Sequence, residues 1–242
     1  MSVNNEKTRL YLSIPATDLD DLERNISAAE QLASQLDLAC VALTLPDGPT
    51  QDRSLKPLID KIQQKGVAVV LELPRNSLLD DERGDDPAPD MWAKSSLVEH
   101  LARIDNLRAD GLHLPPPLVS PAMLEKARIT LGNNAIIGVD CGLSRHLAMS
   151  LGDAGADYIG FSAAQNEPDD QFANMVSWWQ DLFEIPCVAL NPGDQSQLET
   201  LLHIPADFIA LGAALWPRLR DDPDFTKWMV RQFPLLTQTG QE

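Results

Sequence analysis

The chain has 242 residues, 44% of them hydrophobic, which is enough for one large α/β domain or two small ones. Its formal charge of -17, from 19 basic and 36 acidic residues, argues against a protein that grips nucleic acid or anionic lipid through its overall field. Apolar stretches are no longer than a strand, and the three cysteines lie far apart without metal-ligand spacing. We therefore expect a cytoplasmic protein with no membrane or nucleic-acid partner, no disulfide framework and no zinc site.

Apolar runs of strand length recur along the chain, and segments of helical periodicity follow them. This alternation predicts βα units on a parallel sheet. A count of eight strands predicts a single (β/α)8 TIM barrel over residues 1–242, with no domain boundary. The predicted strands are 9–14, 38–44, 66–73, 110–114, 135–140, 157–162, 186–190 and 207–212.

The helical segments place their apolar residues on one stripe, as a surface helix of such a barrel requires. The last one, 222–233, aligns Phe225, Trp228, Met229 and Phe233, which predicts that it closes the outer layer. Two further aromatic residues, Trp178 and Trp179, fall within a predicted helix. We expect them in the outer core or in an oligomer contact, rather than as a platform for stacking a ligand.

One segment, 76–91, interrupts the alternation between the third strand and the third helix. It holds six carboxylates, one Arg and two prolines. Loops that follow strands lie at the C-terminal face of a barrel, where active sites form, so this acidic insertion is expected over the mouth. It is either a solvated surface insertion or a lid or docking surface.

The second half of the chain resembles a known family. The segments "DGLHL" (110–114), "IIGVDCGLSRHLAMSLGDAGADYIGF" (136–161) and "IPCVALNPGDQSQLETLLHIPADFIALGAAL" (185–215) are similar to strands four to eight of the thiamine phosphate synthase and TenI family. The resemblance implies a TIM barrel. It also implies an activity that joins a hydroxymethylpyrimidine pyrophosphate to a thiazole phosphate, uses magnesium and releases pyrophosphate.

Several positions depart from the synthase pattern. The Gln, Arg and Lys series that meets the pyrophosphate after the second strand corresponds here to Ala42, Thr44 and Pro46. The Asn-Asp pair of the third strand, whose Asp holds magnesium, corresponds to Glu72 and Leu73. The Gly-Gln and second metal-binding Asp after the fourth strand are replaced by residues 115–118, three prolines and a leucine.

The departures continue on the later strands. Asp140 replaces the Ser after the fifth strand, and residues 162–180, where synthases carry a pyrophosphate-binding Lys, contain no Lys or Arg. Asn191, Pro192 and Gly193 replace the glycine pair that receives the thiazole phosphate, and Pro192 has no N–H to donate. Each lost cation costs about 2–4 kcal/mol of transition-state stabilisation. We therefore expect no synthase activity and no magnesium or other cofactor.

The candidate catalytic residues are two carboxylates at strand ends. Glu72 is either a general base or hydrogen-bonding partner for a cationic or amide-bearing ligand, or simply an exposed rim carboxylate. Asp140 either acts on a ligand or caps the fifth helix. Cys141 is either a nucleophile or, more commonly for a lone small residue at a strand end, a packing residue.

The candidate ligand-binding residues come from four strands. His113 belongs to the "DGxHL" pattern and either meets a ligand or makes a structural hydrogen bond. Small residues after strands seven and eight favour a phosphate held on backbone N–H groups. Amides after strand six suit an uncharged ring. The candidate phosphate-binding residues are Asn191, Gly193, Gly212 and Ala213, and the candidate amides are Gln165 and Asn166.

Three functions remain open from the sequence. The first is a divergent barrel of this family that binds a small phosphorylated or heterocyclic ligand at its mouth, or that performs a metal-free isomerase-type proton transfer. The second is a non-catalytic protein that docks a partner through its acidic loop. The third is an authentic thiamine phosphate synthase. A homodimer is compatible with each of them.

Overall fold

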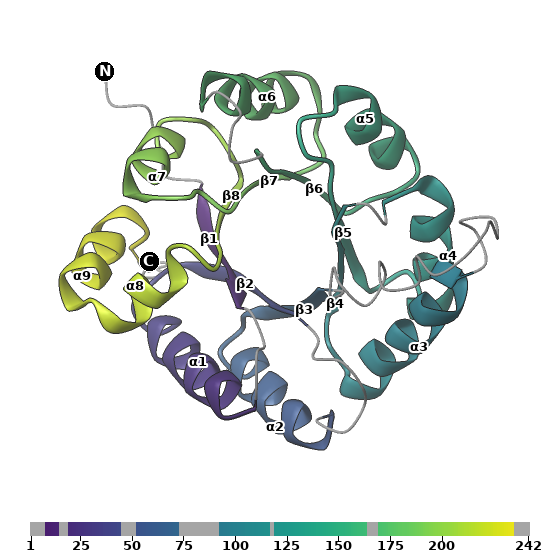
Figure 1. Cartoon of the computed structure of the whole chain (residues 1–242), viewed down its shortest axis with the longest axis horizontal. Coiled ribbons are helices and arrows are strands. Elements are labelled where there is room, and N and C mark those ends of the chain that lie inside the picture. Colours follow the sequence, from purple (N-terminus) through teal and green to yellow (C-terminus); the bar gives the residue numbers. More distant parts are fainter. Residues whose placement is uncertain are drawn as a thin grey trace, which may run out of the picture.

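The computed structural model describes residues 8–14, 19–44, 52–72, 92–116, 119–163 and 169–234. Eight parallel strands pair in chain order and close into a barrel (Figure 1). The predicted strands and fold class are therefore confirmed. The predicted acidic loop, 76–91, lies outside the described residues. The strands are β1 (Arg9–Ile14), β2 (Leu38–Thr44), β3 (Ala68–Glu72), β4 (Gly111–Leu114), β5 (Ile136–Asp140), β6 (Tyr158–Phe161), β7 (Cys187–Leu190) and β8 (Phe208–Leu211).

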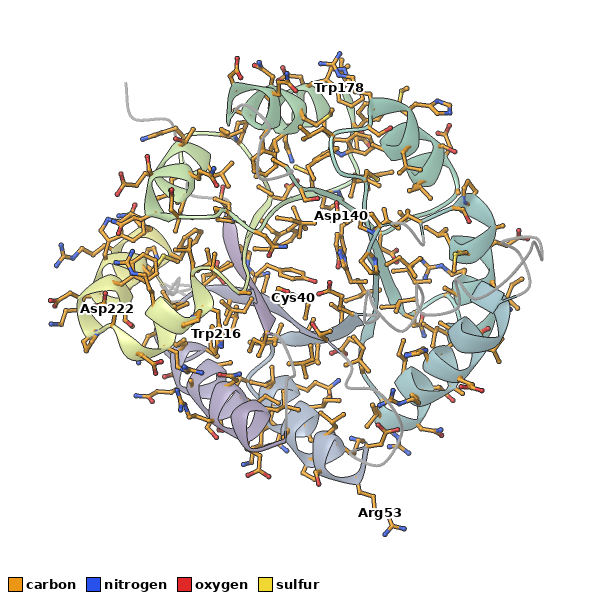
Figure 2. All side chains as sticks on the ribbon, in the orientation of Figure 1. Cys40, Arg53, Asp140, Trp178, Trp216 and Asp222 are labelled. Atoms are coloured by element: carbon orange, nitrogen blue, oxygen red, sulfur yellow. The ribbon has the colours of Figure 1, made fainter. Side chains whose placement is uncertain are left out.

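Helices surround the barrel as an outer ring, and β8 is followed by two of them (Figure 1). Phe225, Met229 and Phe233 of the last helix region are buried, so this helix closes the outer layer as predicted. Arg53, on α2, projects outward from the ring (Figure 2). The helices are α1 (Leu19–Leu32), α2 (Asp52–Gln63), α3 (Trp92–Leu107), α4 (Pro121–Leu131), α5 (Arg145–Asp153), α6 (Asp169–Leu182), α7 (Gln195–Leu201), α8 (Trp216–Asp221) and α9 (Pro223–Gln232).

The two neighbouring tryptophans of α6 have different environments. Trp179 is fully buried, stacks on Phe183 with ring centroids 4.0 Å apart, and donates its indole N–H to the Ile185 carbonyl at 2.7 Å. Trp178 is half-buried beneath the guanidinium of Arg145, which lies 4.7 Å from its ring centroid. The expected place in the outer core is thus confirmed for Trp179.

The core has two compartments. The larger lies between the strands and the helices, and the smaller fills the barrel interior. Because successive side chains on a strand point to opposite faces, every second strand residue enters the interior. The buried interior residues are Tyr11, Cys40, Ala42, Val70, Tyr158, Val188, Leu190 and Ala210.

Glycine provides the space for the largest interior side chain. A Cβ placed on Gly138 of β5 would lie 1.8 Å from Cζ of Tyr158, the paired residue on β6. Real Cβ atoms do not approach other atoms so closely. The ring of Tyr158 therefore fits only because residue 138 is a glycine, which has no side chain. Gly138 positions Tyr158 across the middle of the barrel.

Aspartates fasten the N-terminal ends of the strands. An Asp immediately before β4, β6 and β8 accepts a backbone N–H from the strand before it, at 2.7, 2.7 and 2.9 Å respectively. Each such bond satisfies a donor at a strand end, where it would otherwise face water or a buried void. In order, the pairs are Asp110 with Val69, Asp157 with Ile137, and Asp207 with Cys187.

Each of these aspartates also accepts a hydrogen bond from a side chain on the preceding helix. That helix comes just before the strand whose N–H the Asp accepts. Gln63 of α2 bonds to Asp110 at 3.0 Å, Arg128 of α4 bonds to Asp157 at 2.6 Å, and Gln180 of α6 bonds to Asp207. Helix, strand and the next strand are therefore joined at one carboxylate.

Asp157→Ala is expected to lower the free energy of unfolding by about 1–3 kcal/mol, because the N–H of Ile137 loses its side-chain acceptor and Arg128 loses its charged partner, keeping only backbone carbonyls as acceptors. Urea unfolding followed by circular dichroism measures the change. Asp153→Ala is the control, because that residue is exposed at the end of α5 and is expected to change stability by less than about 0.5 kcal/mol. Equal effects of the two substitutions would contradict the fastening role.

Candidate functional site

Glu72 ends β3 and faces the barrel interior. Its register neighbours are Thr44 on β2 and His113 on β4. Its Oε2 accepts a hydrogen bond at 3.3 Å from Oγ of Ser13, which comes from β1, two strands away. The side chain is half-buried. Glu72 therefore lies at the mouth of the barrel and is partly rather than fully exposed, and its role toward a ligand stays a prediction.

Asp140 ends β5, is 1% exposed, and also lies inside the ring of strands (Figure 2). Its two oxygens each lie 2.9 Å from the donating Oγ of Ser162, which follows β6. Its Oδ1 also accepts the N–H of Gly142 at 2.9 Å. The N-cap of α5 is Ser144, whose side chain accepts the N–H of Leu147, so the prediction that Asp140 caps this helix is wrong. Asp140 instead ties the loop after β5 to the end of β6.

His113 of β4 is 4% exposed, and its Nδ1 lies 2.9 Å from Oη of Tyr158. The Tyr158 Oη lies 3.1 Å from Oη of Tyr11, so three side chains from β1, β4 and β6 form one hydrogen-bonded chain across the interior. His113 thus makes the structural hydrogen bond that the sequence allowed, while a contact between His113 and a ligand stays a prediction. This chain holds the middle of the barrel in one arrangement.

The carboxylates at the mouth affect the pKa of both tyrosines. Burial raises the pKa of Tyr11 and of Tyr158 well above the usual value, and the negative charge of Glu72 raises both further. Asp140 also contributes to the raised pKa of Tyr158. Glu72 and Asp140 therefore act on the same interior, and both phenols stay protonated at neutral pH.

The loops after β7 and β8 lie against each other. Asn191 has a left-handed backbone with φ of 55°, and its N–H donates to the Ala210 carbonyl at 2.9 Å. A Cβ on Gly212 would lie 2.1 Å from Oδ1 of Asn191, so the Asn191 side chain covers Gly212. Gly212 is buried and Ala213 is exposed. The structure thus brings together three of the residues predicted to hold a phosphate.

The fourth predicted phosphate-binding residue, Gly193, uses its N–H within the chain. That N–H donates to Oε1 of Gln197 at 2.7 Å, and Pro192 beside it has no N–H. Gln165 and Asn166 lie outside the described residues. In this arrangement, the loop after β7 offers a phosphate fewer donors than the glycine pair of the synthase pattern.

Cys141 follows β5 and is 3% exposed. Burial, together with the negative charge of the adjacent Asp140, raises the pKa of its thiol to about 12. A nucleophilic cysteine needs the opposite shift, so the structure favours the packing alternative.

We expect Cys40, Cys141 and Cys187 to react slowly with an aromatic disulfide reagent at pH 8 in the folded protein. All three are buried, and burial raises their pKa to about 12, 12 and 11, so the thiols stay protonated at this pH. Absorbance of the released thiolate measures the rate. The denatured protein serves as the control and is expected to react completely within the mixing time of seconds to minutes. A fast-reacting thiol in the folded protein would contradict this assignment.

The end of β4 carries two of the prolines. Strand β4 ends at Leu114, and Pro115 is buried while Pro116 is half-buried. Neither has an N–H, so neither can donate a hydrogen bond to a pyrophosphate, and neither side chain has an oxygen that could hold a metal. Within the ranges that the structure describes, no group of three or more His, Cys, Asp or Glu residues is placed to hold a metal ion.

The sequence interpretation missed the two tyrosines and Ser13. A signal was present, because Tyr11, Ser13 and Tyr158 occupy alternate positions of their strands, on the same face as other interior residues. That pattern places polar atoms inside the barrel, although it does not say which of them meet.

These features define the chain as a (β/α)8 barrel in which two carboxylates face the interior at the C-terminal mouth. The TMP-TENI family, described as thiamine monophosphate synthase, matches residues 98–215. The thiamine-phosphate synthase of Rhodospirillum centenum is 31% identical over 216 residues, which are 86% of this chain and 89% of that protein. The chain belongs to the thiamine phosphate synthase/TenI family.

One further relative supports the family, and one solved structure supports the fold. The thiamine-phosphate synthase of Erythrobacter litoralis is 38% identical over 125 residues, 49% of this chain and 57% of that protein, so this match spans little more than half of the relative. Thiamine phosphate pyrophosphorylase from Pyrococcus furiosus has the same fold, with a TM-score of 0.61 at 18% identity over 94% of this chain and 98% of that one. In the part of the chain that the structure describes, no helix has the length and apolar character needed to cross a membrane.

Proposed function

We propose that this barrel binds a small heterocyclic ligand without a pyrophosphate group at its C-terminal mouth, and that it does not form thiamine phosphate. The observation that carries the proposal is the inward placement of Glu72 and Asp140 at the ends of β3 and β5. Two carboxylates in one mouth favour a ring that is cationic or rich in N–H donors, and they repel a pyrophosphate ester.

The charge balance at the strand ends supports the same conclusion. Pyrophosphate becomes a good leaving group only when cations neutralise its developing charge. The final residues of β1 to β8, all of them described, include two carboxylates and no Lys or Arg. With about 2–4 kcal/mol lost for each missing cation, a reaction that expels pyrophosphate would be slowed by several orders of magnitude.

Magnesium does not fit the described residues well. Proteins hold Mg²⁺ with one or two carboxylates together with substrate phosphates. Asp140 is already committed to Ser162 and Gly142, and the prolines after β4 provide no oxygen-bearing side chain. We propose that ligand binding at this mouth is independent of magnesium.

Glu72 is also the better candidate for a metal-free proton transfer on the bound ring. It is half-buried at the mouth, whereas Asp140 is almost fully buried and accepts bonds from two partners. A general base must be within reach of the proton that it removes, and this accessibility favours Glu72. Exchange of ring-bound hydrogen for deuterium, followed by NMR, would report such a step.

The test combines an activity assay with a binding assay. The purified protein is incubated with both synthase substrates and magnesium, with the Rhodospirillum centenum synthase as the positive control. We expect no thiamine phosphate above the level without protein. Thermal shifts are then recorded with the hydroxymethylpyrimidine and thiazole alcohols and with their phosphate esters, each with and without magnesium.

We expect the shift to be larger for an unphosphorylated alcohol than for its ester, and unchanged by magnesium. In Glu72→Gln, the affinity for that alcohol is expected to fall about tenfold, which corresponds to one charge-assisted hydrogen bond. Asp153→Asn, on the exposed end of α5, is the matched control and should bind as the original chain does. Synthase turnover comparable with the positive control would refute the proposal.

The remaining alternative, docking of a partner through residues 76–91, stays a prediction. A chain without residues 79–90 that loses association with a partner but keeps ligand binding would favour it.

A further inference from the structure

A cavity of about 150 Å³ opens at the end of the barrel opposite the mouth. We propose that this cavity is a binding site for a small uncharged apolar molecule, such as a single aromatic ring. It is formed by residues near the N-terminal ends of six strands together with the two interior tyrosines. The lining residues are Arg9, Tyr11, Ala39, Cys40, Ala68, Ile136, Tyr158, Val188 and Phe208.

Small side chains explain why space remains. Barrel interiors are usually filled in layers by bulky branched residues. Here β2 and β3 contribute Ala39 and Ala68 to the wall, and the rings of Tyr11 and Tyr158 are held in place by their mutual hydrogen bond. Two alanines beside two fixed rings leave a gap that neighbouring side chains do not close.

The size of the gap matches one ring. An apolar cavity of about 150 Å³ in a protein core can stay dry and accept benzene. Larger ligands, such as nucleotides, need pockets of about 300 Å³ or more. The part of a ligand that enters this cavity is therefore about the size of benzene or toluene.

The walls select an uncharged molecule. Ala39, Ala68, Ile136, Val188 and Phe208 present hydrocarbon. The two tyrosine hydroxyls hydrogen-bond to each other and to His113. The tyrosines therefore present their rings to the cavity. Placing an unpaired charge against such walls carries a large desolvation penalty.

The charges around the opening also disfavour an anion. The Nε of Arg9 donates to Oδ1 of Asp37 at 2.9 Å, so this cation is already paired. Asp110, Asp157 and Asp207 stand at the beginnings of β4, β6 and β8, at the same end of the barrel. Asp157 is paired with Arg128, but Asp110 and Asp207 are held only by neutral donors, so no unpaired cation among these residues would attract a carboxylate-bearing ring.

This site is separate from the mouth. Tyr11 precedes Ser13 by two residues on β1, and Ser13 is the partner of Glu72, so the tyrosines lie between the cavity and the carboxylates of the mouth. Cys40 lies in the cavity wall and projects inside the ring of strands (Figure 2), but burial raises its pKa to about 12, so ligand binding is non-covalent at neutral pH.

The test titrates the full chain with toluene and with benzoate and follows ligand binding by saturation-transfer NMR. We expect saturable toluene binding, and benzoate binding at least about tenfold weaker because its charge is desolvated. Ala68→Leu fills the cavity and is expected to weaken toluene binding by tenfold or more, as occupied volume excludes the ring. Ala102→Leu, at an exposed position of α3, is the matched control and should bind toluene normally.

Additional variants keep the test decisive. If Ala68→Leu does not fold, Ala39→Val fills part of the same space with a smaller change. Glu72→Gln should bind toluene as the original chain does, which separates this site from the one at the mouth. The proposal is overturned if toluene does not bind saturably, if it binds the filled variant equally well, or if benzoate binds more tightly than toluene.

Discussion

Replacement of Gly138 by alanine is expected to lower the free energy of unfolding by about 3 kcal/mol, at the upper end of the range for overpacked cores. The new Cβ would lie 1.8 Å from Cζ and 2.2 Å from Cε1 of Tyr158. The ring cannot withdraw without breaking its hydrogen bonds to Tyr11 and His113. An alanine in a strand without this clash would instead gain about 0.5–1 kcal/mol over glycine.

Urea unfolding measures this effect, and Gly152→Ala in α5 is the matched control. There the nearest atoms to a new Cβ are the flexible end of Ile185 at 3.1 Å and Cη2 of Trp179 at 3.3 Å, which shifts of a few tenths of an ångström relieve, so a change of less than about 1 kcal/mol is expected. Tyr158→Leu, which removes the ring, should reduce the effect of Gly138→Ala when the two are combined. If the two effects simply add, the ring is not the cause.

Tyr158→Phe is expected to lower the free energy of unfolding by about 2–3 kcal/mol. The substitution keeps the ring but removes the hydroxyl that links Tyr11 and His113, at 3.1 Å and 2.9 Å. Two buried polar groups then lose a partner, and an unsatisfied buried group costs more than the net gain from a hydrogen bond.

Tyr11→Phe provides the comparison for this prediction. It removes the bond to Tyr158 but leaves that between Tyr158 and His113, so a smaller loss of about 1 kcal/mol is expected. The two variants are compared by urea unfolding in the same buffer. Equal losses would show that the bond to His113 contributes little to stability.

The barrel could be predicted because each strand and helix carries its own period in the sequence. Alternating and helical patterns are local, so eight strands and their order follow without any knowledge of distant contacts. The residue at which a helix begins is harder to predict than the helix itself. Asp140 lies where a cap is expected, but Ser144, four residues later, accepts the N–H of the first helical turn. Between the two residues the chain turns at Gly142, which has φ of 55° and donates its N–H to Asp140, so Asp140 caps this turn and not the helix.

For the site, the sequence predicts which residues lie at strand ends, but not which of them contact one another. Glu72 and Asp140 were found because they follow buried strands, but their inward orientation depends on the register of the closed barrel. The Tyr11 and Tyr158 pair joins residues 147 positions apart, and it forms only when strand tilt brings β1 and β6 across the interior. No local pattern encodes that distance.

The aspartates at the strand beginnings divide the barrel into blocks that could be exchanged. Each carboxylate links a helix, the strand after it and the following even-numbered strand, so the blocks run from α2 to β4, α4 to β6, and α6 to β8. Boundaries between blocks fall in the loops after β2, β4 and β6, which cross none of these links. Those same loops carry Pro46, the prolines from 115 and the segment without cations from 162. The mouth therefore departs from the synthase pattern both at these boundaries and inside the blocks, as at Glu72 and Asp140, while the contacts that join each block lie at the opposite end of the barrel.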